Sequence, residues 1–392
     1  MLKHYTGQFW LLSFSSFLFF ASFNMILPEL PAYLTSLGGE EYIGLILSLF
    51  TLTACISRPF SGKLTDKWGR IPVMVIGAVV CGLGALSYPI LTTVHGFLLI
   101  RLFHGFSTGF KPTGTSAYIA DIVPVNRRGE ALGISSFFGA LGMASGQGAG
   151  SWIYLSFGID TLFYCSSFLS FASVLILMGM KETLEDRSSF QLKMLKINWK
   201  DIIEKRVFPP SIIMVLTCLS FGTTFTLAPL FSDHLGIKNR GIFYMVLTTS
   251  SIIVRVIGGR LSDKFGRQSV LHFSTLILFA SMLVIGFSET TTQFFTGAFI
   301  FGLGYGLNSP TLFAWTIDLS PTETRGKGIS TLFIFLEIGI GVGALLSGSF
   351  YQGDISRFPL IFGATGVFSL IAFFYLLFYR QHQLKSKKHE AG

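Results

Sequence analysis

The chain alternates between long apolar segments and short polar segments along its whole length. A helix that crosses a bilayer needs about 20 mostly apolar residues, because its backbone polar groups must be satisfied within the segment. We therefore expect twelve spanning helices, near residues 9–31, 42–61, 72–91, 96–119, 130–153, 159–180, 208–231, 240–259, 270–288, 292–317, 328–350 and 357–379. The first segment is too long for the core of a signal peptide and lacks a small-residue cleavage site.

Composition supports a membrane protein and argues against several other classes. Of the 392 residues, 51% are hydrophobic and only 12% are charged, too few to cover the surface of a soluble protein of this length. The net charge of +9 is not gathered on one domain, so we expect no nucleic-acid partner. Each of the four cysteines (Cys55, Cys81, Cys165 and Cys218) lies in an apolar run, so we expect neither a disulfide framework nor a metal site.

The distribution of Lys and Arg predicts the orientation. If the N-terminus is cytoplasmic, 22 of the 29 Lys and Arg residues fall in cytoplasmic tails and loops, and the outer loops hold only Lys238, Arg240 and Arg357. Because basic residues accumulate on the cytoplasmic side, we expect a multi-pass protein of the plasma (inner) membrane with both termini in the cytoplasm. The expected organisation is a six-helix half over 1–180, a cytoplasmic linker with a short surface helix over 181–207, a second half over 208–380 and a tail over 381–392.

An internal repeat relates the two halves. The segment RPFSGKLTDKWGR at 58–70 reappears as RVIGGRLSDKFGR at 255–267, 197 positions later. The same offset aligns Gly105 with Gly302 and Asp121 with Asp318, without a gap. Six spans thus repeat as six spans of the same orientation. Parallel six-helix halves related by an axis along the membrane normal form a transporter architecture with its site at the midplane.

Three motifs within this repeat resemble those of the major facilitator superfamily. The sequence GKLTDKWGR at 62–70 resembles motif A, and 259–267 is its second copy. The sequence RLFHG at 101–105 resembles motif B, with His104 where Gln is commoner, and 142–150 resembles motif C, the antiporter motif, with Gln147 in place of its proline. The resemblance implies an all-α fold of two pseudo-symmetric six-helix halves and, as a member of the drug and metabolite proton-antiporter branch, a working monomer.

Charged residues that occur in both halves are candidates for gates. They are Arg58 and Arg255, Asp66 and Asp263, Arg70 and Arg267, Asp121 and Asp318, and Arg128 and Arg325. The resemblance implies that Asp66 meets the N-terminus of span 11 and that Arg70 pairs with Asp121. Both contacts are physically favourable, because a carboxylate gains from a helix N-terminus and an Arg can bind a carboxylate through two hydrogen bonds. We expect these contacts to exist only while the two halves touch at their cytoplasmic ends. The alternative is that these residues are ordinary cytoplasmic loop charges, which would give the same pattern.

Other polar residues at membrane depth have no charged counterpart in the repeat, among them Gln147, which maps to Ala344. Each charge there costs about 2.5–3.5 kcal/mol or more and usually faces a cavity. Helical spacing places Arg101, His104, Lys111 and Tyr118 on one face of span 4. The resemblance implies that spans 1, 4, 7 and 10 line a central cavity, with Tyr305 and Asn308 on span 10. The predicted substrate-binding residues are therefore Arg101, His104, Lys111, Tyr118, Tyr305 and Asn308; a satisfied core histidine is the alternative for His104.

The remaining candidate residues are two carboxylates that have no charged counterpart in the repeat, and three glycines. Glu29 and Glu337 are predicted to couple transport to protons, because a carboxylate in a cavity can exchange a proton for substrate. The alternatives are an interfacial position for Glu29, which follows Pro28, and a static ion pair for Glu337 with one of the repeat arginines. Gly142, Gly146 and Gly150 lie at four-residue spacing and predict close helix packing; the resemblance implies that spans 5 and 8 meet across the halves.

The best-supported function is proton-coupled export of a small amphipathic organic compound, which the cationic residues suggest is anionic or zwitterionic. One alternative is a proton-coupled importer of an organic acid or sugar. An alternative of another class is a non-transporting membrane sensor, which the two copies of motif A disfavour. We expect no cofactor and no enzymatic activity, since the sequence holds no nucleophile–base pair or phosphate-binding loop. The expected partners are a small-molecule substrate, protons and the lipid bilayer.

Overall fold

The computed structural model describes residues 5–124, 127–185, 188–197, 202–321 and 325–390, and within these ranges the chain is helical without a strand. The α-helices are α1 (Gly7–Ile26), α2 (Leu30–Ser36), α3 (Leu45–Lys67), α4 (Arg70–Ser87), α5 (Val94–His104), α6 (Phe106–Ile122), α7 (Arg128–Phe157), α8 (Ile159–Met178), α9 (Phe208–His234), α10 (Gly241–Phe265), α11 (Arg267–Gly286), α12 (Thr291–Leu319), α13 (Arg325–Tyr351) and α14 (Phe358–Glu390). Short 3₁₀ turns cover Glu40–Tyr42, Leu192–Leu195, Lys205–Val207 and Ile355–Arg357.

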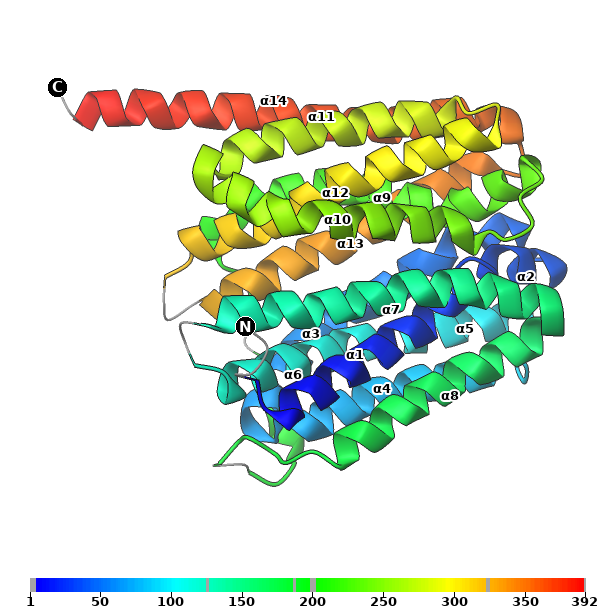
Figure 1. Cartoon of the computed structure of the whole chain (residues 1–392), viewed down its shortest axis with the longest axis horizontal. Coiled ribbons are helices and arrows are strands. Elements are labelled where there is room, and N and C mark those ends of the chain that lie inside the picture. Colours follow the sequence, from blue (N-terminus) through cyan, green and yellow to red (C-terminus); the bar gives the residue numbers. More distant parts are fainter. Residues whose placement is uncertain (1–4, 125–126, 186–187, 198–201, 322–324, 391–392) are drawn as a thin grey trace.

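The helices form two halves that lie side by side (Figure 1). In the first half, which runs from α1 to α8, α1 packs most extensively on α7; in the second, α9 packs in the same way on α13. Between the halves, α3 packs on α13 and α7 packs on α10. Each of these pairs of contacts is related by the sequence repeat. The described residues thus make twelve crossings in two pseudo-symmetric groups of six, which confirms the predicted fold class.

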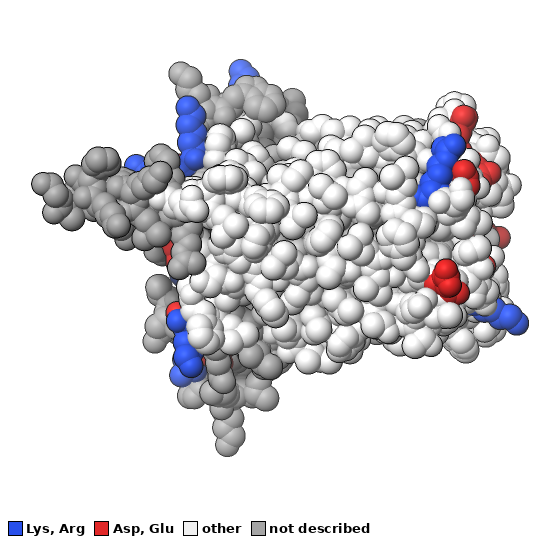
Figure 2. Space-filling model, turned by 90° about the horizontal axis from the view of Figure 1, so that it is seen from above, with Lys and Arg blue, Asp and Glu red and all other residues white. Residues whose placement is uncertain are grey.

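The bundle has an apolar middle and two charged ends. Both chain termini lie at one end (Figure 1), which we call the terminal end, and the opposite end is the far end. Figure 2 shows Lys, Arg, Asp and Glu side chains at the two ends and a band without them between. Eight of the described helical segments are long and apolar enough to cross a membrane, and Gly241–Arg255 is a shorter apolar helix. The chain is therefore a multi-pass membrane protein.

Helix starts at the far end follow local sequence signals. The Thr93 hydroxyl accepts the backbone N–H of Gly96 at 3.1 Å and caps α5. Its counterpart in the repeat, Thr290, caps α12 by accepting the N–H of Gln293 at 3.3 Å. Such caps satisfy backbone donors that the first turn of a helix leaves unpaired. Equivalent capping therefore fixes the start of the fourth crossing in both halves.

The linker differs from its prediction. Its described part contains short 3₁₀ turns and no surface helix. The carboxylate of Glu182 accepts the backbone N–H groups of Arg70 and Ile71, both at 3.0 Å, and so caps α4. Further along, Met194 is buried against Leu64 and Val73. The apolar side chain is thus satisfied by docking on the first half, which removes the need for an amphipathic helix.

The three glycines of α7 pack against α1. A Cβ atom at Gly142, Gly146 or Gly150 would meet the backbone of Phe17, Ala21 or Met25, respectively. The stripe thus faces a neighbour within the first half, whereas the resemblance had directed attention to the α7–α10 contact across the halves. Close backbone approach of this kind is typical of small residues in membrane helices.

Substitution of Gly150 by Ala should destabilise the protein. Its added methyl group has no room beside Met25, and overpacking costs about 1–3 kcal/mol. The matched control is Gly133→Ala on the same helix, where nothing lies within 4 Å of the added atom. We expect a lower thermal unfolding midpoint in detergent for Gly150→Ala and an unchanged or raised midpoint for Gly133→Ala, since Ala favours helix. Equal midpoints for the two variants would contradict the packing.

Candidate functional site

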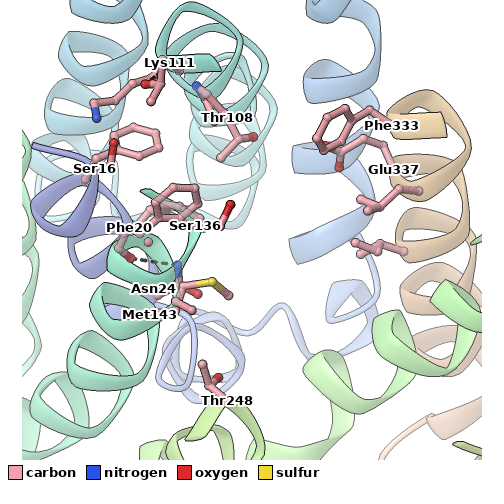
Figure 3. Close-up of a pocket in the computed structure, with 18 of the residues that line it drawn as sticks. Ser16, Phe20, Asn24, Thr108, Lys111, Ser136, Met143, Thr248, Phe333 and Glu337 are labelled. Carbon is pink, nitrogen blue, oxygen red and sulfur yellow. Dashed lines mark hydrogen bonds between the residues drawn. The ribbon is translucent and has the colours of Figure 1, made fainter. Parts of the chain in front are cut away.

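A cavity of about 390 Å³ lies between the two halves. Its walls come from α1, α3, α6 and α7 on one side and from α9, α10, α12 and α13 on the other. Most of the lining is apolar and aromatic, including Phe19, Phe20, Phe50, Phe221, Phe225 and Phe333. Its volume is that of a site for a small organic molecule. Figure 3 shows Lys111 and Glu337 on opposite sides of this space.

The cavity extends toward the terminal end. Its lining includes Ser116 and Ile119 near the last turn of α6 and Leu132 in the first turns of α7. In the described part of the chain, the hydrogen bonds that join the halves lie at mid-depth or nearer the far end. The structure therefore represents a state that is open at the terminal end and closed at the far end.

An ion pair between Glu29 and Arg240 closes the far end. Glu29 is 1% exposed, accepts the hydroxyl of Ser151 and pairs with Arg240 of the other half. Arg240 also binds Asp233 at 2.6 Å. Burial disfavours the charge on Arg240, but the carboxylates of Asp233 and Glu29 outweigh it and raise the pKa of the guanidinium above its usual value. Glu29 thus joins the halves at the far end and does not line the cavity.

Gln147 of α7 connects this helix with α1 and α10 toward the closed far end. Its side-chain amide donates to Asn24 of α1 at 3.2 Å, and its carbonyl oxygen accepts from Thr248 of α10 at 3.3 Å. One turn further, the backbone N–H of Gly241 donates to Ser151 at 2.9 Å. The residue that replaces the motif C proline therefore bonds across the halves.

Three basic residues in the described part of the chain line the cavity, and they differ in how their charge is balanced. Arg58 pairs with Glu337 of the other half at 2.6 Å and lies over the ring of Phe333. Lys111 is 1% exposed, with its Nζ 4.9 Å from the ring centroid of Phe19. Arg255 also lines the cavity, and the ion pairs recorded for the described residues include neither Lys111 nor Arg255.

Arg101 and His104 lie outside the cavity. The Nε of Arg101 donates to the carbonyl of Ile46 at 2.8 Å, and an Nη donates to Tyr88 at 3.2 Å. His104 contacts the same tyrosine hydroxyl at 3.4 Å and is fully buried. Phe50 stacks over Arg101 and lines the cavity on its other side, so its ring separates the two basic residues from the cavity. Helical spacing had placed Arg101 and His104 on one face with Lys111, but Ile46 and Tyr88 cover that face at this depth.

Of the remaining predicted binding residues, only Tyr305 lines the cavity. The hydroxyl of Tyr118 donates to the Lys181 carbonyl at 2.7 Å and so ties α6 to the start of the linker. Asn308 donates to Thr217 at 2.9 Å and accepts from Ser274 at 3.2 Å. The side chain of Asn308 is thus satisfied inside its own half, and that of Tyr118 at the start of the linker.

The repeat charges form equivalent networks at the terminal end. Arg70 bonds Asp121 at 3.0 Å and Asp66 at 3.3 Å. In the second half, Arg267 bonds Asp318 at 2.9 Å and also pairs with Asp263. Arg128 is exposed, and the side chain of Arg325 lies outside the described residues.

These networks correct one expectation. Each network lies within its own half. The side chain of Asp66 is 74% exposed, and its described partner is Arg70. The expected partner was the start of span 11, which is α13. The reason is that the halves are apart at this end, where the cavity opens. The Arg70–Asp121 pair is present nonetheless, so it does not require contact between the halves.

Several residues that line the cavity were not predicted from the sequence. Asn24, Ser136 and Thr248 line the cavity without a charge or motif to mark them (Figure 3). Arg58 and Arg255 were assigned to gates, although both line the cavity. Among the described residues, no group of three His, Cys, Asp or Glu side chains could hold a metal ion.

Comparisons with known proteins agree with this architecture. A family model described as Major Facilitator Superfamily matches residues 12–268 and 241–392. The chain is 28% identical over 395 residues to the Multi-drug resistance efflux pump PmrA of Streptococcus pneumoniae serotype 4, across 93% of this chain and 95% of that protein. It is 26% identical over 400 residues to the Quinolone resistance protein NorA of Staphylococcus aureus, across 97% of this chain and 98% of that protein. Among solved structures, the peptide transporter POT in complex with sulfate superposes with a TM-score of 0.80 at 15% identity, across 97% of this chain and 96% of that chain.

Replacement of Arg240 by Gln should loosen the far end. It leaves the buried Glu29 without a counter-charge, and breaking a buried pair in this way costs about 3–5 kcal/mol. We expect faster hydrogen–deuterium exchange in the far-end turns of α7 and α10, measured by mass spectrometry on the protein in detergent. The control is Arg357→Gln, because Arg357 pairs with Asp354 inside one half at the same end. Unchanged exchange in Arg240→Gln would show that this pair does not hold the far end closed.

Proposed function

The chain belongs to the major facilitator superfamily, and we propose that it is a proton-coupled exporter of small amphipathic organic compounds that works by alternating access. A relative named as a multi-drug resistance efflux pump and another named as a quinolone resistance protein align with it over nearly their whole length. The first of these names supports export. The observation that carries the proposal is the aromatic cavity between the halves, open at one end only, with a buried ion pair across it. Both halves of one chain supply the walls, so a monomer is sufficient.

We place the terminal end in the cytoplasm of the cell that carries the protein in its plasma membrane. Most Lys and Arg residues of the sequence fall at that end, as expected for a cytoplasmic side. On this assignment the structure is an inward-facing state, ready to take a compound from the cytoplasm. Export then requires the terminal end to close and the far end to open.

The Arg58–Glu337 pair is our candidate for proton coupling. It joins α3 and α13 across the halves, and both side chains are more than nine-tenths buried. A proton on Glu337 removes the negative charge and with it the electrostatic attraction to Arg58. The free-energy difference between the two conformational states then changes by the amount that this attraction contributed to one of them. A proton can drive a conformational exchange in this way.

The gates are the second part of the proposal. When the terminal end closes, the exposed Asp66 gains access to the start of α13, where a carboxylate is stabilised by the helix dipole. At the far end, opening breaks the Glu29–Arg240 pair and the contacts of Gln147. Different contacts thus hold each state, and neither state has both sets.

Substitution of Glu337 by Gln should abolish proton-driven export. The amide keeps the size of the side chain but cannot release a proton, so it cannot couple the two gradients. The measurement compares intracellular small molecules in an efflux-deficient bacterium that expresses wild type or Glu337→Gln, with and without a protonophore. We expect wild type to deplete a compound class, and both the protonophore and Glu337→Gln to abolish the depletion.

The matched control is Glu289→Gln, which removes an exposed carboxylate at the far end and should export like wild type. Membrane insertion of each variant is checked by quantifying purified protein. Accumulation in place of depletion would favour an importer, and export by Glu337→Gln that still responds to the protonophore would remove this residue from the coupling step.

A further inference from the structure

The repeat makes Arg58 and Arg255 equivalent, but among the described residues only Arg58 has a carboxylate partner. Arg58 lies on α3 and pairs with Glu337 of α13 at 2.6 Å. The offset that relates the halves carries Arg58 to Arg255 on α10, and it relates Glu337 to Ala140 on α7. The two contacts between the halves, α3 on α13 and α7 on α10, are related in the same way. The second contact therefore has the arginine without the acid.

Arg255 lines the cavity, and the described residues provide no carboxylate to balance its charge. Its side chain and Ala140 both line the cavity. Its Nε is buried and has no hydrogen-bond partner within the described ranges of the chain. A buried guanidinium normally finds a carboxylate, because an unpaired charge in a region of low dielectric is costly. At the position equivalent to Glu337, the carboxylate is replaced by the methyl group of Ala140.

We propose that the acidic group of the substrate takes this place and pairs with Arg255, so that the transported compounds are aromatic organic anions. This inference rests on the proposed function and names the substrate class of the same cavity. The planar guanidinium suits a carboxylate, which it binds through two parallel hydrogen bonds.

The rest of the cavity fits such a compound. Among the described residues that line it, Arg58, Lys111 and Arg255 are basic and only Glu337 is acidic. Glu337 is already paired with Arg58, and the ammonium of Lys111 is buried over the ring of Phe19. The cation left for a substrate anion is therefore Arg255. The phenylalanine walls offer apolar surface and ring faces for an aromatic body.

The test uses three probes with one aromatic body: pyrenebutanoic acid, pyrenebutanol and pyrenebutylamine. Their binding to the purified full chain in lipid nanodiscs is measured by fluorescence anisotropy, and their export is measured in cells. We expect the acid to bind at least about tenfold more tightly than the alcohol, as one charge-assisted interaction provides, and the amine to bind most weakly.

Two variants test the role of Arg255, one by removing its charge and the other by neutralising it. Arg255→Gln removes the cation, and Ala140→Glu supplies the missing carboxylate within the protein. We expect both to bring the affinity for the acid to that of the alcohol. Ala140→Gln has the same bulk without the charge and should keep the preference for the acid. A size-exclusion profile and thermal midpoint accompany each variant, and Ala140→Glu is the decisive one if Arg255→Gln does not fold.

The outcomes separate this inference from the proposed function. Equal binding of acid and alcohol by wild type, or a preference that survives Ala140→Glu, overturns the inference whether or not export occurs. Export of all three probes at the same rate supports the exporter and contradicts anion selectivity. Preferential binding of the acid without export of any probe supports the site and counts against the exporter.

Discussion

A charge at membrane depth must be balanced, and this requirement organises the interior of the protein. Arg101 is balanced inside one half by a carbonyl, a tyrosine hydroxyl and an aromatic ring. Arg58 and Glu337 balance each other across the halves. In the described part of the chain Arg255 has neither solution, and it lines the cavity. The first arrangement stabilises a half, the second links the halves, and the third leaves charge available for a ligand.

The repeat and its exceptions have different roles. The paired networks around Arg70 and Arg267 have nearly the same geometry, and Thr93 and Thr290 cap equivalent helices. Such features belong to the scaffold that both halves need. The site arises where the copies diverge, because a substrate and a proton are not symmetric. Glu337 without a counterpart on α7 is the clearest such divergence.

The sequence predicted the fold far better than it predicted the cavity. Apolar segment lengths and the repeat are properties of the chain itself, so the starts of the twelve crossings could be placed within 3 residues, although α14 continues 11 residues past its predicted end, to Glu390. Helical spacing likewise identified the face of α6 that carries Lys111. It could not show that Phe50 covers Arg101, or that Asn308 is satisfied by Thr217 and Ser274, because those contacts depend on how neighbouring helices pack. The closed end of the cavity is likewise set by the approach of the halves, which no local pattern encodes.

Double electron–electron resonance with spin labels in both halves tests the central claim most directly. One pair of labels at Gly129 and Lys264 reports on the terminal end, and a second pair at Thr35 and Lys238 reports on the far end; all four positions are exposed. Alternating access predicts that, under a proton gradient with pyrenebutanoic acid present, the first distance shortens while the second lengthens. Distances that stay fixed, or that change in the same direction at both ends, would contradict a cavity that opens to one side at a time.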